Sequence, residues 1–417
     1  MSAPRIVITG MGCVTPLGGD VKETWEGLVA GRNAIGRIER FDPSGFPTTF
    51  AAEVKRLRAP RLDGRFARWV DDKSRFALSA AEQAIEDAAL DLGALDRGRV
   101  GVSIGAEVSR PDLPTLARRA KELATLDGPE AYRSVDPKDF VVMSAFFPAT
   151  AMAYTHGLMG PNLTTSTACT SSAQSVADAL RILRRGDADV MLAGGTDRLV
   201  EELMVMGFGL LGALSTRNED PAHACRPFDR TREGFVLGEG AGIVVLETLE
   251  HARSRGARIH AELLGYGCSA NAWRITDSPP DGRGARASMA AALDDAGIGA
   301  DDVDYVNAHG TSTQQNDASE SAGIVGVFGG RRVPVSSTKS MMGHLVAACG
   351  AVELIACVQA IRTGILPPTI NHEFPDPGCD IDCVPNEARR ARVDVALTNA
   401  FGFGGSNGSL IVGRYTA

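Results

Sequence analysis

The sequence predicts an α/β fold built from two similar halves. Short apolar runs rich in β-branched residues alternate with longer Ala-rich stretches, as expected of buried strands that lie between helices. The same order of elements then begins again in the second part of the chain, which indicates an internal duplication. With 417 residues, 44% of them apolar, the chain can form two domain-sized cores.

Four strands and two helices are predicted in the first half. The strands are residues 5–9, 100–104, 190–193 and 242–246, and the helices are residues 74–90 and 172–185. Residues 42–67 are rich in Pro, Arg and Phe, which is typical of irregular surface. Residues 107–139 are charged and contain no clear strand, so a helical insertion is predicted there.

The second half repeats this alternation. Its predicted strands are residues 259–267, 303–308, 333–336, 395–398 and 409–412, and its helices are residues 284–296, 319–328 and 343–363. A polar, Gly-containing segment, RSRGA at 253–257, separates the two series. The predicted halves are therefore residues 1–255 and residues 256–417.

Charge and cysteine usage narrow the class of protein. The net charge is −8, without the basic excess of a nucleic-acid binder. The start, MSAPRIVITGMG, lacks the charged and apolar regions of a secretion signal, and no apolar run approaches the roughly 18 residues that span a bilayer. We expect a cytoplasmic protein with reduced thiols and no membrane contact.

Two short patterns do not indicate a cofactor or metal ion. GFGLLG at 207–212 matches a dinucleotide-binding pattern, but no convincing strand precedes it and no acidic residue stands at the ribose position. Cys379 and Cys383 are the closest cysteine pair, and no second Cys or His pair stands at zinc-site spacing around them. We expect no metal site and no bound cofactor.

The first candidate for chemistry is Cys169. It lies in TSTACTSSAQS (165–175), where small and hydroxyl residues lead into a predicted helix. A thiol at a helix N-terminus lies at the positive end of the helix dipole, which favours the thiolate. A buried structural cysteine is the competing interpretation, and this segment alone does not decide between them.

Two histidines follow predicted strands in the second half. His309 lies in NAHGTST (307–313), at the carboxyl end of a strand, where α/β folds place active sites. His344 and Lys339 lie in STKSMMGHLVAACG (337–350), before an apolar helix, where buried polar groups need partners. Glu353 follows and can pair with Lys339 if the chain folds back. A turn histidine satisfied by local hydroxyls remains the alternative for His309.

A glycine-rich segment closes the set. AFGFGGSNG (400–408) surrounds Phe401 and Phe403 with glycines, so it can present a backbone N–H to a substrate oxygen, although a plain hairpin turn has the same composition. Together the segments supply a thiol, two imidazoles, a Lys–carboxylate pair and a glycine-rich gate. That set suits acyl transfer followed by stabilisation of a carbanion or enolate.

With these segments in order, the chain resembles the β-ketoacyl-ACP synthases, especially the synthase II group and its bacterial polyketide relatives. TACTSS, GFVLGEGAG (234–242), NAHGTST, KSMMGHL and the GFGGSNGSLIV end carry the resemblance, which covers nearly the whole chain. It implies a thiolase fold with two α/β halves in five αβαβα layers. It also implies an acyltransferase that condenses an acyl group with malonyl-ACP, in fatty-acid or type II polyketide biosynthesis.

The resemblance also implies residue roles. Cys169 would carry the acyl group, and His309 and His344 would hydrogen-bond the malonyl thioester. Lys339, paired with Glu353, would maintain the geometry and the electrostatic potential of the site. The backbone N–H groups of Cys169 and Phe403 would form the oxyanion hole. Implied substrate contacts are Thr311, Thr313, Phe403, Phe401, Phe208 and Val108, and implied structural supports are Asp317 and Glu320.

The implied partners are an acyl carrier protein and a second subunit, either identical or homologous. Arg65, Arg68 and Lys73 lie where this family docks its acidic carrier, although a solvated helix face is the alternative interpretation. No nucleic acid or membrane partner is implied, and no cofactor beyond the carrier's phosphopantetheine.

The chain departs from the family in three places. GAEVSRPD places Glu107 and Arg110 in a loop that is usually Gly-rich, Gln314–Gln315 replace the usual Pro-Ala, and Trp273 stands where a smaller residue is expected. These departures suggest a specialised chain, with a loop suited to a partner subunit or to a polar, unsaturated acyl chain.

Two other functions remain open from the sequence. One is a non-catalytic, chain-length-determining polyketide subunit, although such subunits lack the nucleophile. The other is a CoA-dependent thiolase, although no Cys follows Cys383 in the C-terminal glycine loop. The sequence leaves acyl chain length and saturation undecided.

Overall fold

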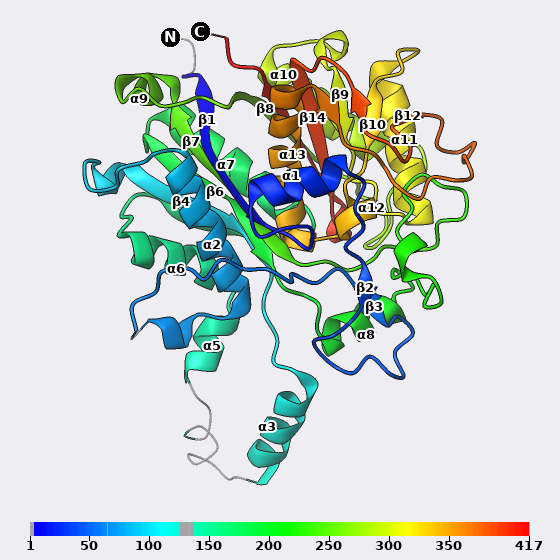
Figure 1. Ribbon diagram of the computed structural model, residues 1–417, viewed down its shortest axis with the longest axis horizontal. Coiled ribbons are helices and arrows are strands. Elements are labelled where there is room, and N and C mark those ends of the chain that lie inside the picture. Colours follow the sequence, from blue (N-terminus) through cyan, green and yellow to red (C-terminus); the bar gives the residue numbers. More distant parts are fainter. Residues whose placement is uncertain (1–3, 65, 126–132, 134–136, 417) are drawn as a thin grey trace.

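The computed structural model describes residues 4–64, 66–125, 133 and 137–416. One sheet of eleven strands runs through this described part of the chain (Figure 1). In spatial order the strands are β12 (Asp382–Cys383), β10 (Pro334–Ser336), β9 (Tyr305–Asn307), β14 (Val395–Phe401), β15 (Ser406–Gly413), β8 (Ala261–Ala270), β1 (Ile6–Val14), β7 (Gly240–Thr248), β6 (Val190–Asp197), β4 (Val100–Gly105) and β5 (Asn162–Thr165).

The strand order is the same in both halves. Along the chain the first half contributes β1, β4, β5, β6 and β7, and the second contributes β8, β9, β10, β14 and β15. Read from the outer edge of each half toward the middle of the sheet, both sets have the order third, second, fourth, fifth, first. The second strand is parallel to the third and fourth in each half, and the fifth is antiparallel to the first. The predicted duplication is therefore confirmed.

The halves meet through a short antiparallel junction between β1 and β8. It consists of the pairs Ile6–Leu263, Val7–Glu262 and Ile8–Ala261. The predicted boundary at 255/256 falls between α9 (Leu249–Ser254) and β8, and it stays a prediction.

Helices cover the sheet in layers. α2 (Asp72–Asp87) packs on the outer face of the first half, and α10 (Arg283–Ala296) with α11 (Gln314–Phe328) on the outer face of the second. Between the halves, α7 (Ser171–Arg185) and α13 (Cys349–Thr363) pack against each other and against strands of both halves. This gives the αβαβα arrangement of the thiolase fold.

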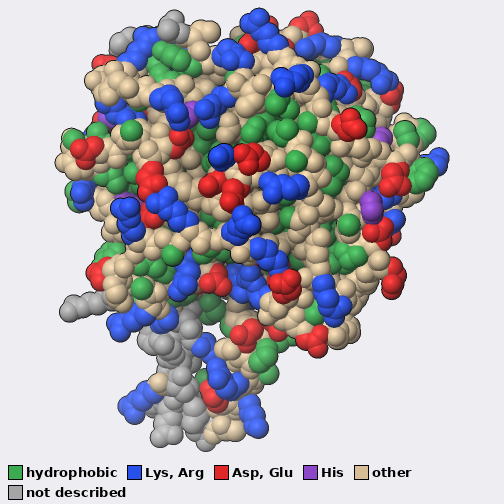
Figure 2. Space-filling view, in the orientation of Figure 1, with side chains coloured by type: hydrophobic (Ala, Val, Ile, Leu, Met, Phe, Trp, Pro, Cys, Tyr) green, Lys and Arg blue, Asp and Glu red, His purple; other side chains and the backbone are tan. Residues whose placement is uncertain are grey.

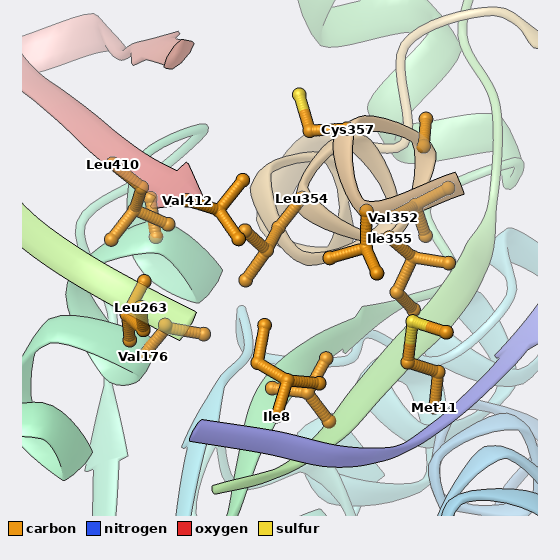
Figure 3. Packing of buried hydrophobic residues seen from close by; sticks show 14 of the residues in the cluster. Ile8, Met11, Val176, Leu263, Val352, Leu354, Ile355, Cys357, Leu410 and Val412 are labelled. Atoms are coloured by element: carbon orange, nitrogen blue, oxygen red, sulfur yellow. The ribbon is translucent and has the colours of Figure 1, made fainter. Parts of the chain in front are cut away.

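The central core surrounds α13. Figure 3 shows Val352, Leu354, Ile355 and Cys357 of α13 among side chains from β1, β8, β15 and α7. Residues 349–361 are all buried, so α13 has protein on every side, and apart from Glu353 and Gln359 the side chains of this stretch are apolar or small.

Equivalent glycines bring each outer helix close to its sheet. A Cβ on Gly12 of β1 would lie 2.0 Å from the Ala80 carbonyl oxygen of α2. A Cβ on Gly267 of β8 would lie 2.1 Å from the Ser288 carbonyl oxygen of α10. Only glycine permits such an approach, and both halves use it at the same place.

The remaining elements surround this body. α1 (Val21–Val29) packs on β1, and α6 (Phe147–His156) lies beside α2. Where the structure describes it, the insertion between β4 and α6 contains the predicted helices, α3 (Leu113–Thr125) and α5 (Pro137–Met143). α3 projects away from the body (Figure 1). α8 (Glu202–Leu210) follows β6, and two short ribbons pair β2 (Gly36–Arg37) with β3 (Phe50–Ala51) and β11 (Ile365–Leu366) with β13 (Arg389–Arg390).

Two predicted helix boundaries were wrong, and one strand was missed. The helix predicted at 343–363 begins only at Cys349, as α13. A short helix, α12 (Lys339–Met342), and a 3₁₀ turn (Val346–Ala348) precede it, because Gly343 has a φ of 68° and Val346 a φ of 46°. α11 begins earlier than predicted, at Gln314, where the Thr313 side chain caps it by accepting from the Asn316 N–H. β5 was not predicted, because NLTT is short and polar.

One helical stretch is long and apolar enough to span a bilayer. It comprises Val346–Thr363, so the expectation that no such run exists was wrong. That stretch is 89% buried inside the protein, where it forms the 3₁₀ turn and α13. It is a core helix of the fold.

Candidate active site

Cys169 lies between β5 and α7, in a tight turn. Ala168, just before it, has a φ of 53°, in the left-handed region that non-glycine residues rarely adopt. The Ser171 hydroxyl closes the turn, because it accepts from the Thr167 N–H at 2.8 Å and donates to the Ala168 carbonyl at 2.6 Å. We call residues 166–171 the nucleophile turn.

Two imidazoles face the Cys169 sulfur. His344 Nε2 lies 3.0 Å from Sγ, and the rings of His309 and His344 stand edge to face with centroids 5.2 Å apart. His309 follows β9 and His344 follows β10 and α12, so the carboxyl ends of neighbouring parallel strands bring them together. The structure therefore assembles the predicted thiol and both predicted imidazoles.

The backbone around His344 fixes its position and tautomer. The Val346 N–H donates to Nδ1 at 3.3 Å, so in the neutral ring the proton is on Nε2 and points at the sulfur. The His344 N–H donates to the Val236 carbonyl at 2.7 Å, and the Gly238 N–H donates to the His344 carbonyl at 2.9 Å. GFVLGEGAG thus holds His344, a role that the sequence analysis did not assign to it.

Both imidazoles are neutral at physiological pH. Burial, and then the nearby Lys339 charge, lower the pKa of His344 well below its usual value. The same two causes, with His344, lower the pKa of His309. Neutral rings with an N–H can donate to an oxygen that gains negative charge.

The Cys169 thiol is protonated at rest. Burial raises its pKa to about 12, although the Lys339 charge and a hydrogen bond from the Phe403 N–H act in the opposite direction. The helix N-terminus was expected to favour the thiolate, but burial is the larger influence on the thiol pKa. The sulfur must lose its proton as a substrate binds.

Lys339 and Glu353 form a buried ion pair, as predicted from the sequence. Burial alone would lower the pKa of Lys339, but the Glu353 carboxylate and the other groups around it raise it above its usual value. The ammonium is therefore charged, and it lowers the pKa of both histidines and of the thiol.

Two buried carboxylates brace the His309 segment. Glu320 accepts from the N–H groups of His309 and Gly310, each at 2.8 Å, and from Asn399 Nδ2 at 3.0 Å. Asp317 accepts from the Ser312 N–H at 3.2 Å and lies 3.6 Å from the Arg232 guanidinium. Both residues lie where a supporting role was predicted.

A pocket of about 240 Å³ opens onto the three reactive groups. Its lining includes the predicted Thr311, Thr313, Phe208, Phe401 and Phe403. Val108 was also predicted to line it, but it is absent from the lining and is 47% exposed.

The pocket has lining residues that the sequence analysis missed. Phe235 packs edge to face on His344, with centroids 5.4 Å apart, and Glu233 and Asp277 add carboxylates to the wall. Phe235 lies inside GFVLGEGAG, so that segment was the available signal. Gln314 and Gln315, noted as departures, also line the pocket, whereas Trp273 is about half exposed and has Arg274 and Arg283 over its ring.

The glycine-rich segment packs on the nucleophile turn. A Cβ on Gly402 would lie 3.0 Å from the Thr167 carbonyl oxygen and 3.2 Å from the Cys169 nitrogen. This close contact places the Phe403 N–H at the sulfur. The backbone N–H groups of Cys169 and Phe403, predicted to form the oxyanion hole, thus lie on two segments in close contact, and their joint role stays a prediction.

The two described residues of the predicted docking patch, Arg68 and Lys73, differ in exposure. Arg68 is exposed, but Lys73 is 1% exposed in α2 and its ammonium binds the Glu107 carbonyl, so its assignment was wrong. Arg65 lies outside the described residues. On the face shown in Figure 2, basic and acidic side chains are interspersed.

The same three groups could also bind a metal ion. One candidate ligand atom from each of Cys169, His309 and His344 lies within 4.8 Å of the other two. A thiolate and imidazoles suit zinc, but the thiol is protonated at rest and would have to ionise first. The arrangement fits a hydrogen bond from the His344 Nε2–H to the sulfur without further change.

The chain is similar to known condensing enzymes over its full length. Residues 3–252 match the family model described as beta-ketoacyl synthase, N-terminal domain, and residues 260–373 match the C-terminal domain. A 3-oxoacyl-[acyl-carrier-protein] synthase 2 of Coxiella burnetii is 44% identical over 99% of both chains.

Solved structures agree in fold. A beta-ketoacyl synthase from Burkholderia phymatum has a TM-score of 0.91 and 37% identity, and covers 99% of this chain and 100% of its own. A type II polyketide ketosynthase, solved in complex with its acyl-carrier protein and bound to a hexaketide, has a TM-score of 0.88 and 34% identity, with both chains fully covered.

Proposed function

Because the chain belongs to the β-ketoacyl synthase family, we propose that it joins an acyl group held on Cys169 to malonyl-ACP and releases CO₂ and a β-ketoacyl-ACP. It is an acyltransferase of fatty-acid or polyketide chain elongation. The observation that carries this proposal is the thiol 3.0 Å from a neutral imidazole, beside a second imidazole, at the base of one pocket.

The first half-reaction is acyl transfer. The Cys169 sulfur attacks the thioester of an acyl-ACP, loses its proton, and forms a new thioester as the carrier's thiol leaves. The N–H groups of Cys169 and Phe403 donate to the oxyanion of the tetrahedral intermediate. Lys339 supports the developing thiolate electrostatically.

The second half-reaction is decarboxylative condensation. Malonyl-ACP binds with its thioester oxygen near His309 and His344, whose N–H groups stabilise the enolate as CO₂ leaves. The enolate carbon then attacks the Cys169 thioester, so that a carbon–carbon bond forms and the sulfur–carbon bond breaks. The chemistry uses no metal ion and no cofactor beyond the carrier's phosphopantetheine.

The partners follow from this reaction. The substrate is carried by an acyl carrier protein, and Thr311 and Thr313 at the pocket wall suit contacts with the pantetheine arm. Solved relatives include a ketosynthase with a chain length factor, so an identical or a homologous subunit is proposed as the second partner. We also propose a cytoplasmic location and two halves divided at 255/256.

The test is intact-protein mass spectrometry. The protein is incubated with a panel of acyl-ACPs and then with malonyl-ACP, with Cys169→Ala as the control. We expect an acyl adduct on the unaltered protein alone, and its release as a product two carbons longer. An unaltered protein that takes no acyl group would contradict the proposal. The acyl-ACPs that load distinguish fatty-acid from polyketide elongation.

A further inference from the structure

The loop after β4 places a carboxylate against the nucleophile turn. Glu107 Oε1 accepts from the Ala168 N–H at 3.1 Å and from the Ser166 hydroxyl at 3.0 Å, and it lies 3.4 Å from the Ser171 hydroxyl. One oxygen therefore binds groups on both sides of Cys169.

The nucleophile turn needs such support. Ala168 is held in the left-handed region, a conformation that is strained for a residue with a side chain. Ala168 directly precedes Cys169, so a change in the backbone conformation of this turn would rotate Cys169 relative to His344. The bond to Glu107 satisfies that N–H in its strained position.

Glu107 is itself held by a buried lysine. The Lys73 ammonium, 1% exposed in α2, donates to the Glu107 backbone carbonyl. Asp197 and Glu201, both buried, also lie near Lys73. Asp197 also accepts from the Ala347 N–H at 3.2 Å, in the turn after His344, so the cluster contacts the turns that carry both groups.

We propose that Glu107, anchored by Lys73, is a positioning residue that holds the nucleophile turn so that Cys169 faces His344. It acts through the hydrogen bonds to residues 166–171 and not through contact with substrate. The inference rests on the proposed role of Cys169 as nucleophile. It also explains why a charged residue stands in a loop that the sequence analysis marked as unusual.

The test compares Glu107→Gln with Glu107→Ala, and Glu122→Gln on exposed α3 serves as the matched control. The readouts are loading of Cys169 from octanoyl-ACP, decarboxylation of malonyl-ACP, and alkylation of Cys169 by iodoacetamide. We expect Glu107→Ala to load about tenfold more slowly, because the Ala168 N–H loses its acceptor. Glu107→Gln keeps an acceptor oxygen and should stay within about threefold, and the control should not change.

Decarboxylation separates positioning from general damage. It depends on His309 and His344, so it should be preserved in Glu107→Ala. The proposal is overturned if Glu107→Ala loads like the unaltered protein, if Glu107→Gln falls as far as Glu107→Ala, or if decarboxylation falls in step with loading.

The alkylation readout needs no carrier protein. If the unaltered protein neither loads nor decarboxylates, the proposed function fails, and alkylation still decides the positioning role. Equal alkylation rates in Glu107→Ala and Glu107→Gln would then overturn it, and a change confined to Glu107→Ala would support it.

Discussion

At Cys169 the local charges act against one another, and this balance sets how the thiol reacts. Burial raises its pKa, Lys339 lowers it, and the Glu107 and Asp197 carboxylates raise it further. His309 and His344 are neutral and add no charge. Near neutral pH the sulfur is consequently a thiol, and the thiolate fraction grows as the pH rises toward the raised pKa.

This balance predicts the pH dependence of alkylation. Iodoacetamide reacts with the thiolate, so a raised thiol pKa means that the rate should rise about tenfold per pH unit between pH 7 and pH 9. Peptide mass spectrometry of the Cys169 peptide measures this rate. A rate that is already constant at pH 7 would show that the thiol ionises much more easily than its burial implies.

The buried Lys339–Glu353 pair predicts a loss of stability. Lys339→Ala leaves the Glu353 carboxylate buried without its partner, which should lower the free energy of unfolding by about 3–5 kcal/mol. Urea titration measures the loss. The double variant Lys339→Met/Glu353→Leu removes both charges and should recover most of it, and equal losses in both variants would count against the pair.

The role of a residue could be predicted from the sequence where a motif carried chemistry. It could not be predicted where the role depends only on whether the side chain is buried in the fold. Cys169, His309 and His344 stand out in the sequence because their neighbours are small, hydroxylated or glycine. Lys73 looked like any surface lysine, because sequence does not show which face of α2 is covered. Glu107 was visible as unusual, but its hydrogen bonds to residues 166–171 depend on how β4 meets α7.

At the scale of elements, equivalent helices bring the reactive groups together. Cys169 precedes α7 and His344 precedes α13, and each of these helices follows the third strand of its half. The two helices pack against each other, so the turns before them converge. The sequence pattern predicted both helices. It placed the start of α13 too early, at Gly343, because the residues between Gly343 and Cys349 have a composition that is also typical of a helix.

The contact between β4 and α7 predicts the effect of a single methyl group. A Cβ on Gly105 would lie 2.3 Å from the Ser171 carbonyl carbon, so Gly105→Ala must displace the start of α7. We expect a stability loss of about 1–3 kcal/mol together with slower loading of Cys169. Thermal unfolding and mass spectrometry measure the two effects. Gly330→Ala, with no atom within 4 Å of the added methyl, is the matched control.

At the scale of the whole molecule, the sheet ends on β5, whose outer edge has no strand beside it among the described residues. Met159, just before β5, is 72% exposed. We expect a second subunit to pair along this edge, because its backbone hydrogen-bonding groups are open to another strand and Met159 beside it is exposed. The sequence did not predict this edge, because β5 itself was missed.

This edge predicts self-association. Light scattering after size exclusion should give the chain twice its own mass, and Met159→Asp should shift it toward the monomer. Val325→Asp, on the outer helix α11, should not. An unaltered chain that remains monomeric would contradict the prediction. If the dimeric mass is then recovered on adding a homologous subunit, the assembly is a heterodimer.

The position of β1 has a consequence for how the chain folds during synthesis. Ile6 pairs with Thr248 in one half and with Leu263 in the other, so β1 is made long before either neighbour exists. At roughly 5–20 residues per second, the ribosome needs on the order of 10–50 s to reach them. During that time the apolar residues of β1 lack the partners that bury them, which makes this strand a natural substrate for a chaperone on the nascent chain.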